Sequence, residues 1–153
     1  MTHSFGHYVS IINKYQHIWI NERLEHLGIG SGQFAFINHI SRNEGISQKD
    51  LSRRVVVDKA TTAKAVRKLI DRGYIEKRVN ETDNRIHNLF LTERGWEILP
   101  ELKRVRRENS EVLKEGMSVE EEELVEKILK KMLKNISFQI SSHPCCMKRG
   151  INE

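Results

Sequence analysis

The spacing of apolar residues changes in the middle of the chain, and this change limits the folds that the chain can adopt. Before Gly73, apolar side chains recur every three or four residues, as they do on one face of a helix. In the two short runs 74–79 and 88–91 the spacing falls to about two, which is typical of strands. The polar segment 80–85 joins these runs as a hairpin. The sequence therefore predicts a helical protein with one β-hairpin.

Residues that commonly cap helices divide the rest of the chain into successive predicted helices. Ser31, Ser47, Asp58 and Ser118 each precede a helical run, where a side-chain oxygen can accept a hydrogen bond from a backbone N–H. Gly73 follows such a run, at the position where a left-handed residue ends a helix. The predicted helices cover about residues 4–27, 31–44, 47–54, 58–73, 92–115 and 118–140.

The excess of positive charge lies entirely in one central segment. The 153 residues include 26 Lys and Arg against 21 Asp and Glu, a net charge of +5. Residues 47–87 alone contain 11 basic and 6 acidic side chains, so the rest of the chain is neutral overall. Such a patch attracts the phosphate backbone of nucleic acids, although a solvated basic face without a partner would have the same composition.

The two short helices before the hairpin are joined by a brief turn, and the second has a basic and hydroxyl-bearing face. An α-helix fits the major groove of B-DNA, and residues near its N-terminus reach base edges. Threonines there can exchange hydrogen bonds with bases, and the N-terminus of the preceding helix favours a phosphate. The candidate DNA-binding residues on these helices are Ser47, Gln48, Lys49, Lys59, Thr61, Thr62, Lys64, Arg67 and Lys68.

Asp83 and Arg85 lie in the polar loop of the predicted hairpin. An arginine at the tip of such a wing can enter the minor groove, where a narrow A·T tract concentrates negative potential. We expect the Asp83 carboxylate to hold the guanidinium of Arg85 through a paired contact. The alternative is an exposed salt bridge of little consequence, but the neighbouring basic helix favours DNA binding by both residues.

Short motifs at fixed spacing run through the same region. Asp-Asn-Arg occupies positions 83–85, and Leu-Phe-Leu-Thr-Glu-Arg-Gly occupies 89–95. Together with the segments 50–52, 58–69 and 72–75, they resemble the MarR (multiple antibiotic resistance regulator) family of bacterial and archaeal transcription factors. The wing looks like the Asp-x-Arg signature of this family, although the middle residue, often basic in the family, is asparagine here. The resemblance implies a homodimer, a palindromic operator and regulation by a small molecule.

The terminal helices carry more apolar surface than the central segment can cover. A second copy of the chain would bury this surface and place two recognition helices roughly 34–36 Å apart, whereas a bundle within one chain is the alternative. We therefore expect a mainly α fold with a small β-hairpin wing, that is, a winged helix-turn-helix with long N- and C-terminal dimerisation helices. The expected segments are an N-terminal dimerisation helix (1–30), a DNA-binding domain (31–95), C-terminal dimerisation helices (96–141) and a flexible tail (142–153).

Aromatic and histidine side chains on the first two predicted helices form a candidate ligand pocket. Tyr15, Trp19, Phe36 and His39 could line an apolar cavity that has a polar handle. The resemblance implies a small aromatic effector here, because family members often bind aromatic carboxylates between the dimer helices and the winged module. Ordinary core packing is the alternative for each of the four residues.

Histidines and cysteines near the two ends do not form a diagnostic metal motif. His3 and His7 are four residues apart, and His143 is close to Cys145 and Cys146, but neither group has further ligands at a typical spacing. We therefore expect no metal and no cofactor. The sequence leaves open whether the two adjacent thiols have a redox role.

The features above predict a regulator of transcription and favour no enzyme. The chain lacks the paired carboxylates, nucleophile motifs and phosphate-binding glycine loops of common enzymes. It also lacks a secretory signal and an apolar run long enough to span a membrane. We expect a cytoplasmic homodimer that binds double-stranded DNA sequence-specifically on a palindromic operator, as a ligand-responsive repressor. The alternative is a winged-helix adaptor that binds proteins without binding DNA.

Overall fold

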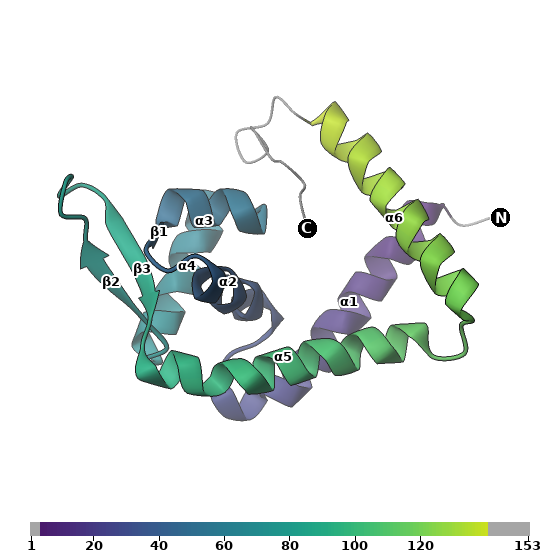
Figure 1. Cartoon of the computed structure of the whole chain (residues 1–153), viewed down its shortest axis with the longest axis horizontal. Helices are drawn as coiled ribbons and strands as arrows, with labels where there is room; N and C mark the ends of the chain where they lie inside the picture. The colour runs from purple at the N-terminus through teal and green to yellow at the C-terminus, as the bar shows by residue number, and fades with distance from the viewer. Residues whose placement is uncertain (1–3, 141–153) are drawn as a thin grey trace.

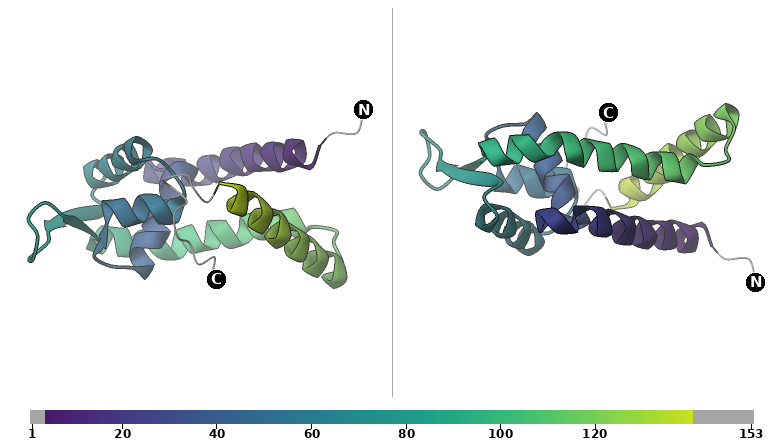
Figure 2. Two further views of the ribbon diagram at one scale, coloured as in Figure 1. Left: turned by 90° about the horizontal axis from the view of Figure 1, so that it is seen from above. Right: turned by 90° about the horizontal axis from the view of Figure 1, so that it is seen from below.

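The computed structural model describes residues 4–140, and these form a winged helix-turn-helix flanked by long helices. Helices α2, α3 and α4 gather beside the hairpin of β2 and β3, and α5 runs along the molecule from the hairpin to α6 (Figure 1). The hairpin projects from one end of the protein, opposite the free end of α1 (Figure 2). The fold class predicted from the sequence is confirmed. The elements are α1 (Phe5–Leu24), η1 (Glu25–Leu27), α2 (Ser31–Arg42), β1 (Ile46–Ser47), α3 (Gln48–Val55), α4 (Lys59–Asp71), β2 (Ile75–Val79), β3 (His87–Leu91), α5 (Glu93–Lys114) and α6 (Val119–Gln139).

The wing is a three-stranded antiparallel sheet with the order β1-β3-β2. The predicted hairpin pairs Ile75 with Leu91 and Val79 with His87. The third strand, β1, was not predicted because its two residues are too few to show an alternating pattern. Ile46 of β1 pairs with Leu89 of β3, so the sheet is tied directly to the start of α3.

One apolar core joins the winged module to parts of the long helices. Leu24 at the end of α1 is fully buried, as are residues of α2, α3, α4 and the sheet. Leu99, Leu102 and Val105 of α5 complete this core. The end of α1 and the start of α5 therefore position the module as well as extending from it. The largest fully buried side chains are Tyr74, Phe36, Leu24, Ile37, Ile40, Leu51, Leu69, Ile75, Leu89, Leu102, Val66 and Val105.

A close backbone approach fixes the start of α5 against the base of the wing. Thr92 caps α5 by accepting a hydrogen bond from the N–H of Gly95, at 3.1 Å, and its own hydroxyl donates to the carbonyl of Gly73, at 2.6 Å. A Cβ atom on Gly95 would lie 2.1 Å from the carbonyl oxygen of Tyr74. Only glycine fits this contact without displacing the backbone, which explains the spacing of threonine and glycine after the wing.

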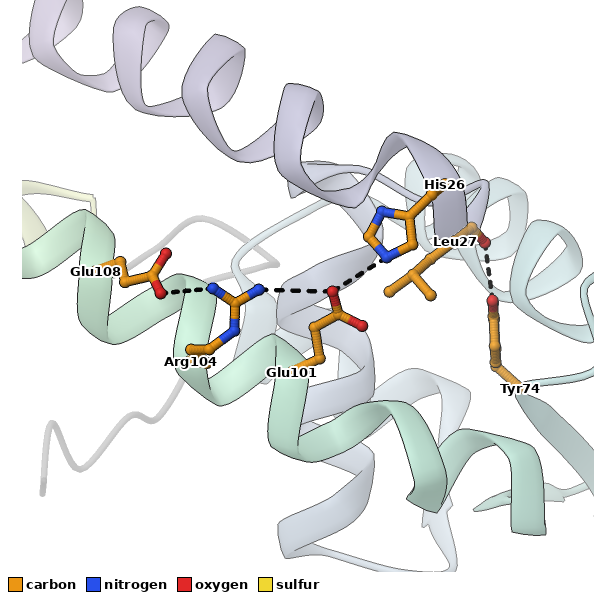
Figure 3. Close-up of polar contacts among 6 residues, drawn as sticks. All are labelled: His26, Leu27, Tyr74, Glu101, Arg104 and Glu108. Atoms are coloured by element: carbon orange, nitrogen blue, oxygen red, sulfur yellow. Dashed lines mark hydrogen bonds and ion pairs between the residues drawn. The ribbon is translucent and has the colours of Figure 1, made fainter.

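Polar contacts of η1, the short helix that follows α1, connect it to the module and to α5 (Figure 3). The buried Tyr74 donates its hydroxyl hydrogen bond to the carbonyl of Leu27, at 2.8 Å. His26 Nε2 lies 3.0 Å from Glu101 Oε1, and Arg104 bridges Glu101 and Glu108 along α5. The ion pairs are partly exposed and add little stability, so the Tyr74 contact is the firmer of these connections.

The cap predictions are confirmed at Ser47, Asp58 and Ser118, and wrong at Ser31. Gly30 is the N-cap of α2, and its N–H donates to Gln33 Oε1 at 3.1 Å. Ser31 is instead the first residue of the helix, with its N–H donating to an α1 side chain. A distant side chain thus supplies an acceptor that local sequence cannot reveal.

Apolar side chains cover the outer parts of α1 and α6 without being buried by this chain. Leu24 is the one buried residue of α1, and none of the residues of α6 is buried within the described chain. In a single protomer these faces meet water, which is unfavourable for so many large apolar groups. The exposed large apolar residues of the two helices are Phe5, Tyr8, Val9, Ile12, Tyr15, Ile18, Val119, Leu124, Val125, Ile128, Leu129, Leu133, Ile136 and Phe138.

Candidate nucleic-acid interface

Helix α4 buries one side in the core and presents the opposite side to solvent. Its buried residues are Thr62, Ala65, Val66 and Leu69. Because a helix turns by about 100° per residue, an i, i+4, i+7, i+11 stripe lies on the far side from this buried set. That outward stripe consists of Ala60, Lys64, Arg67 and Asp71, all of which are exposed.

The cations around this stripe are not neutralised by the protein itself. Lys59, Lys64 and Arg67 are exposed, and over residues 4–140 none of them forms an ion pair with an acidic side chain. Lys68 Nζ lies 3.5 Å from Gln33 Oε1, which leaves its charge unpaired as well. Charges of this kind attract phosphates and release counterions when they bind.

Thr62 does not take part in this surface, so its prediction as a DNA-binding residue is wrong. The side chain is fully buried, and its hydroxyl donates to the carbonyl of Asp58 at 2.9 Å. The hydrogen bond satisfies the hydroxyl inside the core, where no base can reach it. Thr62 and Thr61 are neighbours in sequence but point in directions about 100° apart on the helix.

Thr61 is exposed in the first turn of α4 and is held by the cap residue Asp58. The N–H of Thr61 donates to Asp58 Oδ1 at 2.8 Å, and its hydroxyl donates to Oδ2 at 2.7 Å. These two hydrogen bonds hold the pKa of Asp58 below its ordinary value. The Asp58 carboxylate therefore stays ionised and acts only as an acceptor.

Of the DNA-binding residues predicted at the start of α3, Ser47 forms hydrogen bonds within the protein and Lys49 is exposed to solvent. The Ser47 hydroxyl caps the helix by accepting from the Asp50 N–H at 3.1 Å, and it donates to Asp50 Oδ2 at 2.8 Å. Its hydrogen-bonding capacity is thus largely used within the protein. Gln48 is half-buried, whereas Lys49 is exposed and has no acidic partner among the described residues.

The loop between β2 and β3 is ordered by its own side chains. Asn80 Oδ1 accepts hydrogen bonds from the N–H groups of Thr82, at 2.9 Å, and Asp83, at 3.2 Å. Asp83 Oδ1 accepts the N–H of Arg85 at 2.9 Å. Asp83 was expected to pair with the guanidinium of Arg85, and this is wrong because the carboxylate bonds to the backbone of the turn. The Arg85 side chain is exposed on the projecting wing.

The four residues predicted to form a ligand pocket have different surroundings in the described chain, and none of them lines the hollows found among residues 4–140. Phe36 belongs to the core, and Tyr15 is 69% exposed on α1. Trp19 packs against the core with the guanidinium of Arg23 at 3.3 Å from its ring centroid, and His39 is half-buried on α2. The prediction placed residues of α1 and α2 together, but the sequence does not show how these two helices pack and therefore which side chains converge.

A different hollow, of about 340 Å³, lies between α2 and α5. Its apolar lining includes Phe34, Leu99 and Leu102, and several cations surround these residues. None of these cations forms an ion pair within the described part of the chain. This hollow was not predicted from the sequence, although leucines and basic residues lie close together along 99–107. The polar residues that line the hollow are Asn38, Arg42, Lys103, Arg106, Arg107, Ser110 and Glu111.

Residues 4–140 contain neither a candidate metal cluster nor a candidate membrane-spanning helix. No three of their His, Cys, Asp or Glu side chains are placed to share a metal ion. None of the helices there combines the length and apolar character needed to cross a bilayer. His3, His143, Cys145 and Cys146 lie outside the described residues.

Comparison with known proteins identifies the family of this chain. A sequence model described as the MarR family matches residues 27–86, which include α2, α3, α4 and β2. The crystal structure of a MarR transcriptional regulator from Methanosarcina mazei is 36% identical, with a TM-score of 0.79 over 85% of this chain and 94% of that chain. The chain belongs to the MarR family.

Two further relatives support the same assignment. The MarR protein from Peptoclostridium difficile is 31% identical, with a TM-score of 0.84 over 89% of each chain. The uncharacterised HTH-type transcriptional regulator YybA of Bacillus subtilis is 34% identical over 116 residues, which are 76% of this chain and 77% of YybA. The protein is therefore a winged helix-turn-helix transcriptional regulator of the MarR family.

Proposed function

We propose that this MarR-family protein is a homodimeric repressor that binds a palindromic operator in double-stranded DNA. The observation that carries the proposal is the outward stripe of α4, with its unpaired cations, next to a projecting wing that exposes Arg85. An α-helix with exposed cations suits the major groove, and an arginine at a wing tip suits the minor groove. Because the target is chromosomal DNA, we place the protein in the cytoplasm.

The exposed apolar faces of α1 and α6 support a homodimer. A second copy offers the same apolar faces, so a two-fold arrangement buries both sets at once. A two-fold dimer presents two recognition helices to two half-sites in inverted order, which is why the operator is expected to be palindromic. A dimer bound across a promoter blocks other proteins sterically, so repression needs no additional surface.

Replacing Arg85 with alanine is expected to weaken operator binding by about 1–3 kcal/mol, because the minor-groove contact of the wing is lost. A gel-shift titration with a duplex operator measures this change. Arg94→Ala is the matched control, because it removes another exposed arginine that lies outside the wing. Arg94 is at the start of α5, over the ring of Tyr74. Equal affinities of Arg85→Ala and the unchanged protein would contradict the wing assignment.

The proposed DNA binding is tested by selecting bound duplexes from a random pool and measuring the affinity of the enriched sequence against salt. We expect an enriched inverted repeat, and a fall in log affinity with log salt of about 0.9 per phosphate contact. An adaptor that binds only proteins would enrich no sequence. A flat salt response would contradict the role given to the cations of α4.

The hollow between α2 and α5 supports an aromatic carboxylate as the effector. Phe34, Leu99 and Leu102 offer an apolar surface for a ring, and Arg106 and Arg107 are among the cations that can pair with a carboxylate. This location replaces the pocket expected around Trp19 and Phe36. A ligand here contacts both the module and α5. It can therefore change the angle between the two DNA-binding modules of a dimer.

Benzoate is expected to raise the melting temperature, because a ligand at ten times its Kd stabilises the folded state by about 1.4 kcal/mol. Differential scanning calorimetry with benzoate, and with benzyl alcohol as the uncharged control, measures the effect. Arg106→Ala should reduce the shift with benzoate. Equal shifts with the acid and the alcohol, or none with either, would contradict a basic effector site in this hollow.

A further inference from the structure

The hydrogen bond between Thr61 and Asp58 restricts what the recognition helix can read. A threonine hydroxyl has one proton to donate and two lone pairs to accept with. The Thr61 proton is directed at Asp58 Oδ2, at 2.7 Å, and the same carboxylate accepts the Thr61 N–H through Oδ1. Asp58 is ionised and cannot donate in return. The Thr61 hydroxyl therefore directs its proton at Asp58, and only its lone pairs are available to a hydrogen-bond donor from outside the protein.

We propose that Asp58 is a positioning residue which makes the Thr61 hydroxyl an acceptor only, so that Thr61 selects a base carrying an exocyclic amino group. In the major groove these donors are the N6 amino group of adenine and the N4 amino group of cytosine. The N7, O6 and O4 atoms of the bases are acceptors, and an acceptor-only hydroxyl cannot bind them. The inference rests on the proposed DNA binding, and it adds the polarity of one base contact.

The position of Thr61 in the fold supports this role. It lies in the first turn of the recognition helix, where side chains contact base edges, and its side chain is exposed. The preceding residue, Ala60, lies on the outward stripe, and its small side chain lets the helix approach the bases closely. The cap hydrogen bonds to Asp58 fix the Thr61 side chain before DNA binds, so little conformational freedom is lost on contact.

Substituting Asp58 with asparagine reverses the expected polarity. Asparagine is also a good N-cap, so its amide oxygen can still accept the Thr61 N–H and preserve the helix. Its amide nitrogen can only donate, and it would face the Thr61 oxygen in place of Oδ2. The hydroxyl proton is then free to turn towards the DNA, and Thr61 becomes able to bind an acceptor such as N7 or O6.

The test is a cycle of protein variants against base analogues within the operator that the unchanged protein selects. Each adenine or cytosine in a half-site is replaced in turn by purine or pyrimidin-2-one, which lack the exocyclic amino group. Each purine is also replaced by its 7-deaza form, which lacks the N7 acceptor. Binding is measured for the unchanged protein, Thr61→Val and Asp58→Asn. Thr82→Val serves as the matched control, because this threonine is exposed on the wing and donates to Asn80 Oδ1.

For the unchanged protein, one amino-lacking analogue per half-site should weaken binding about three- to tenfold, as expected for one hydrogen bond. The same analogue should have no effect on Thr61→Val and its full effect on Thr82→Val. Binding by Asp58→Asn should no longer be weakened by the amino-lacking analogue and should instead be weakened by a 7-deaza analogue.

Two results would overturn the inference while leaving DNA binding intact. The first is that Thr61→Val responds to every analogue as the unchanged protein does, because Thr61 then reads no base. The second is that Thr61→Val loses sensitivity only to 7-deaza analogues, because its hydroxyl would then be a donor in the unchanged protein. If the unchanged protein selected no operator at all, the proposed function would fail together with this inference.

Discussion

Replacing Leu129 with aspartate is expected to convert the dimer into monomers and to lower operator affinity by about 100-fold or more. Leu129 is 49% exposed in the protomer, in the middle of the apolar face of α6. Two copies of that face would bury an unpaired carboxylate, which is strongly unfavourable. A monomer can occupy only one half-site and loses the gain from holding both half-sites at once. Sedimentation equilibrium measures the oligomeric state, and fluorescence anisotropy with labelled operator measures the affinity.

The matched control for this dimer prediction is Lys127→Asp, on the charged side of the same helix. Lys127 is exposed and has no ion pair in the described chain. The substitution introduces the same residue and a larger change in charge, so it separates the loss of the apolar contact from an effect of charge. A Leu129→Asp protein that remained dimeric would show that α6 is not the dimer interface.

Reversing the charge of Lys64 is expected to weaken operator binding by about 2–4 kcal/mol, because Lys64→Glu places a carboxylate next to phosphates. Lys64 is exposed on the outward stripe of α4 and contributes nothing to the core. Folding should therefore be unchanged, which circular dichroism and thermal melting can verify. Anisotropy titrations on the selected operator measure the loss of affinity.

Lys127→Glu is the control for this interface prediction, since it makes the same change of charge far along the chain on α6. Its effect on affinity should be small at moderate ionic strength, because salt screens charges that lie more than about 10 Å apart. If Lys64→Glu and Lys127→Glu weakened binding equally, only the total charge would matter, and α4 would not be the helix that meets the groove.

Features set by neighbouring residues could be predicted from the sequence. The caps at Ser47, Asp58 and Ser118 depend on contacts within three residues, and the hairpin depends on a local change of spacing. The motif that ends in Gly95 indicated the family. The structure explains why glycine is needed there, because the carbonyl of Tyr74 leaves no room for a side chain.

Features set by competition between distant or alternative partners could not be predicted. Asp83 has two possible donors on Arg85, and only the geometry of the turn shows that the backbone N–H binds it. Thr61 and Thr62 look equivalent in sequence, but the rotation of α4 against the core buries Thr62. The hollow between α2 and α5 joins segments about 60 residues apart, so no local pattern shows that its cations converge.

In the proposed arrangement, two copies of this chain hold one duplex, each with α4 in the major groove and Arg85 in the minor groove. The most direct test is the mass of the complex between the protein and one short duplex that carries the selected inverted repeat, measured by native mass spectrometry. The proposed arrangement predicts two chains per duplex for the unchanged protein and no stable complex of two chains for Leu129→Asp. A complex of one chain per duplex, equally stable for both proteins, would contradict it.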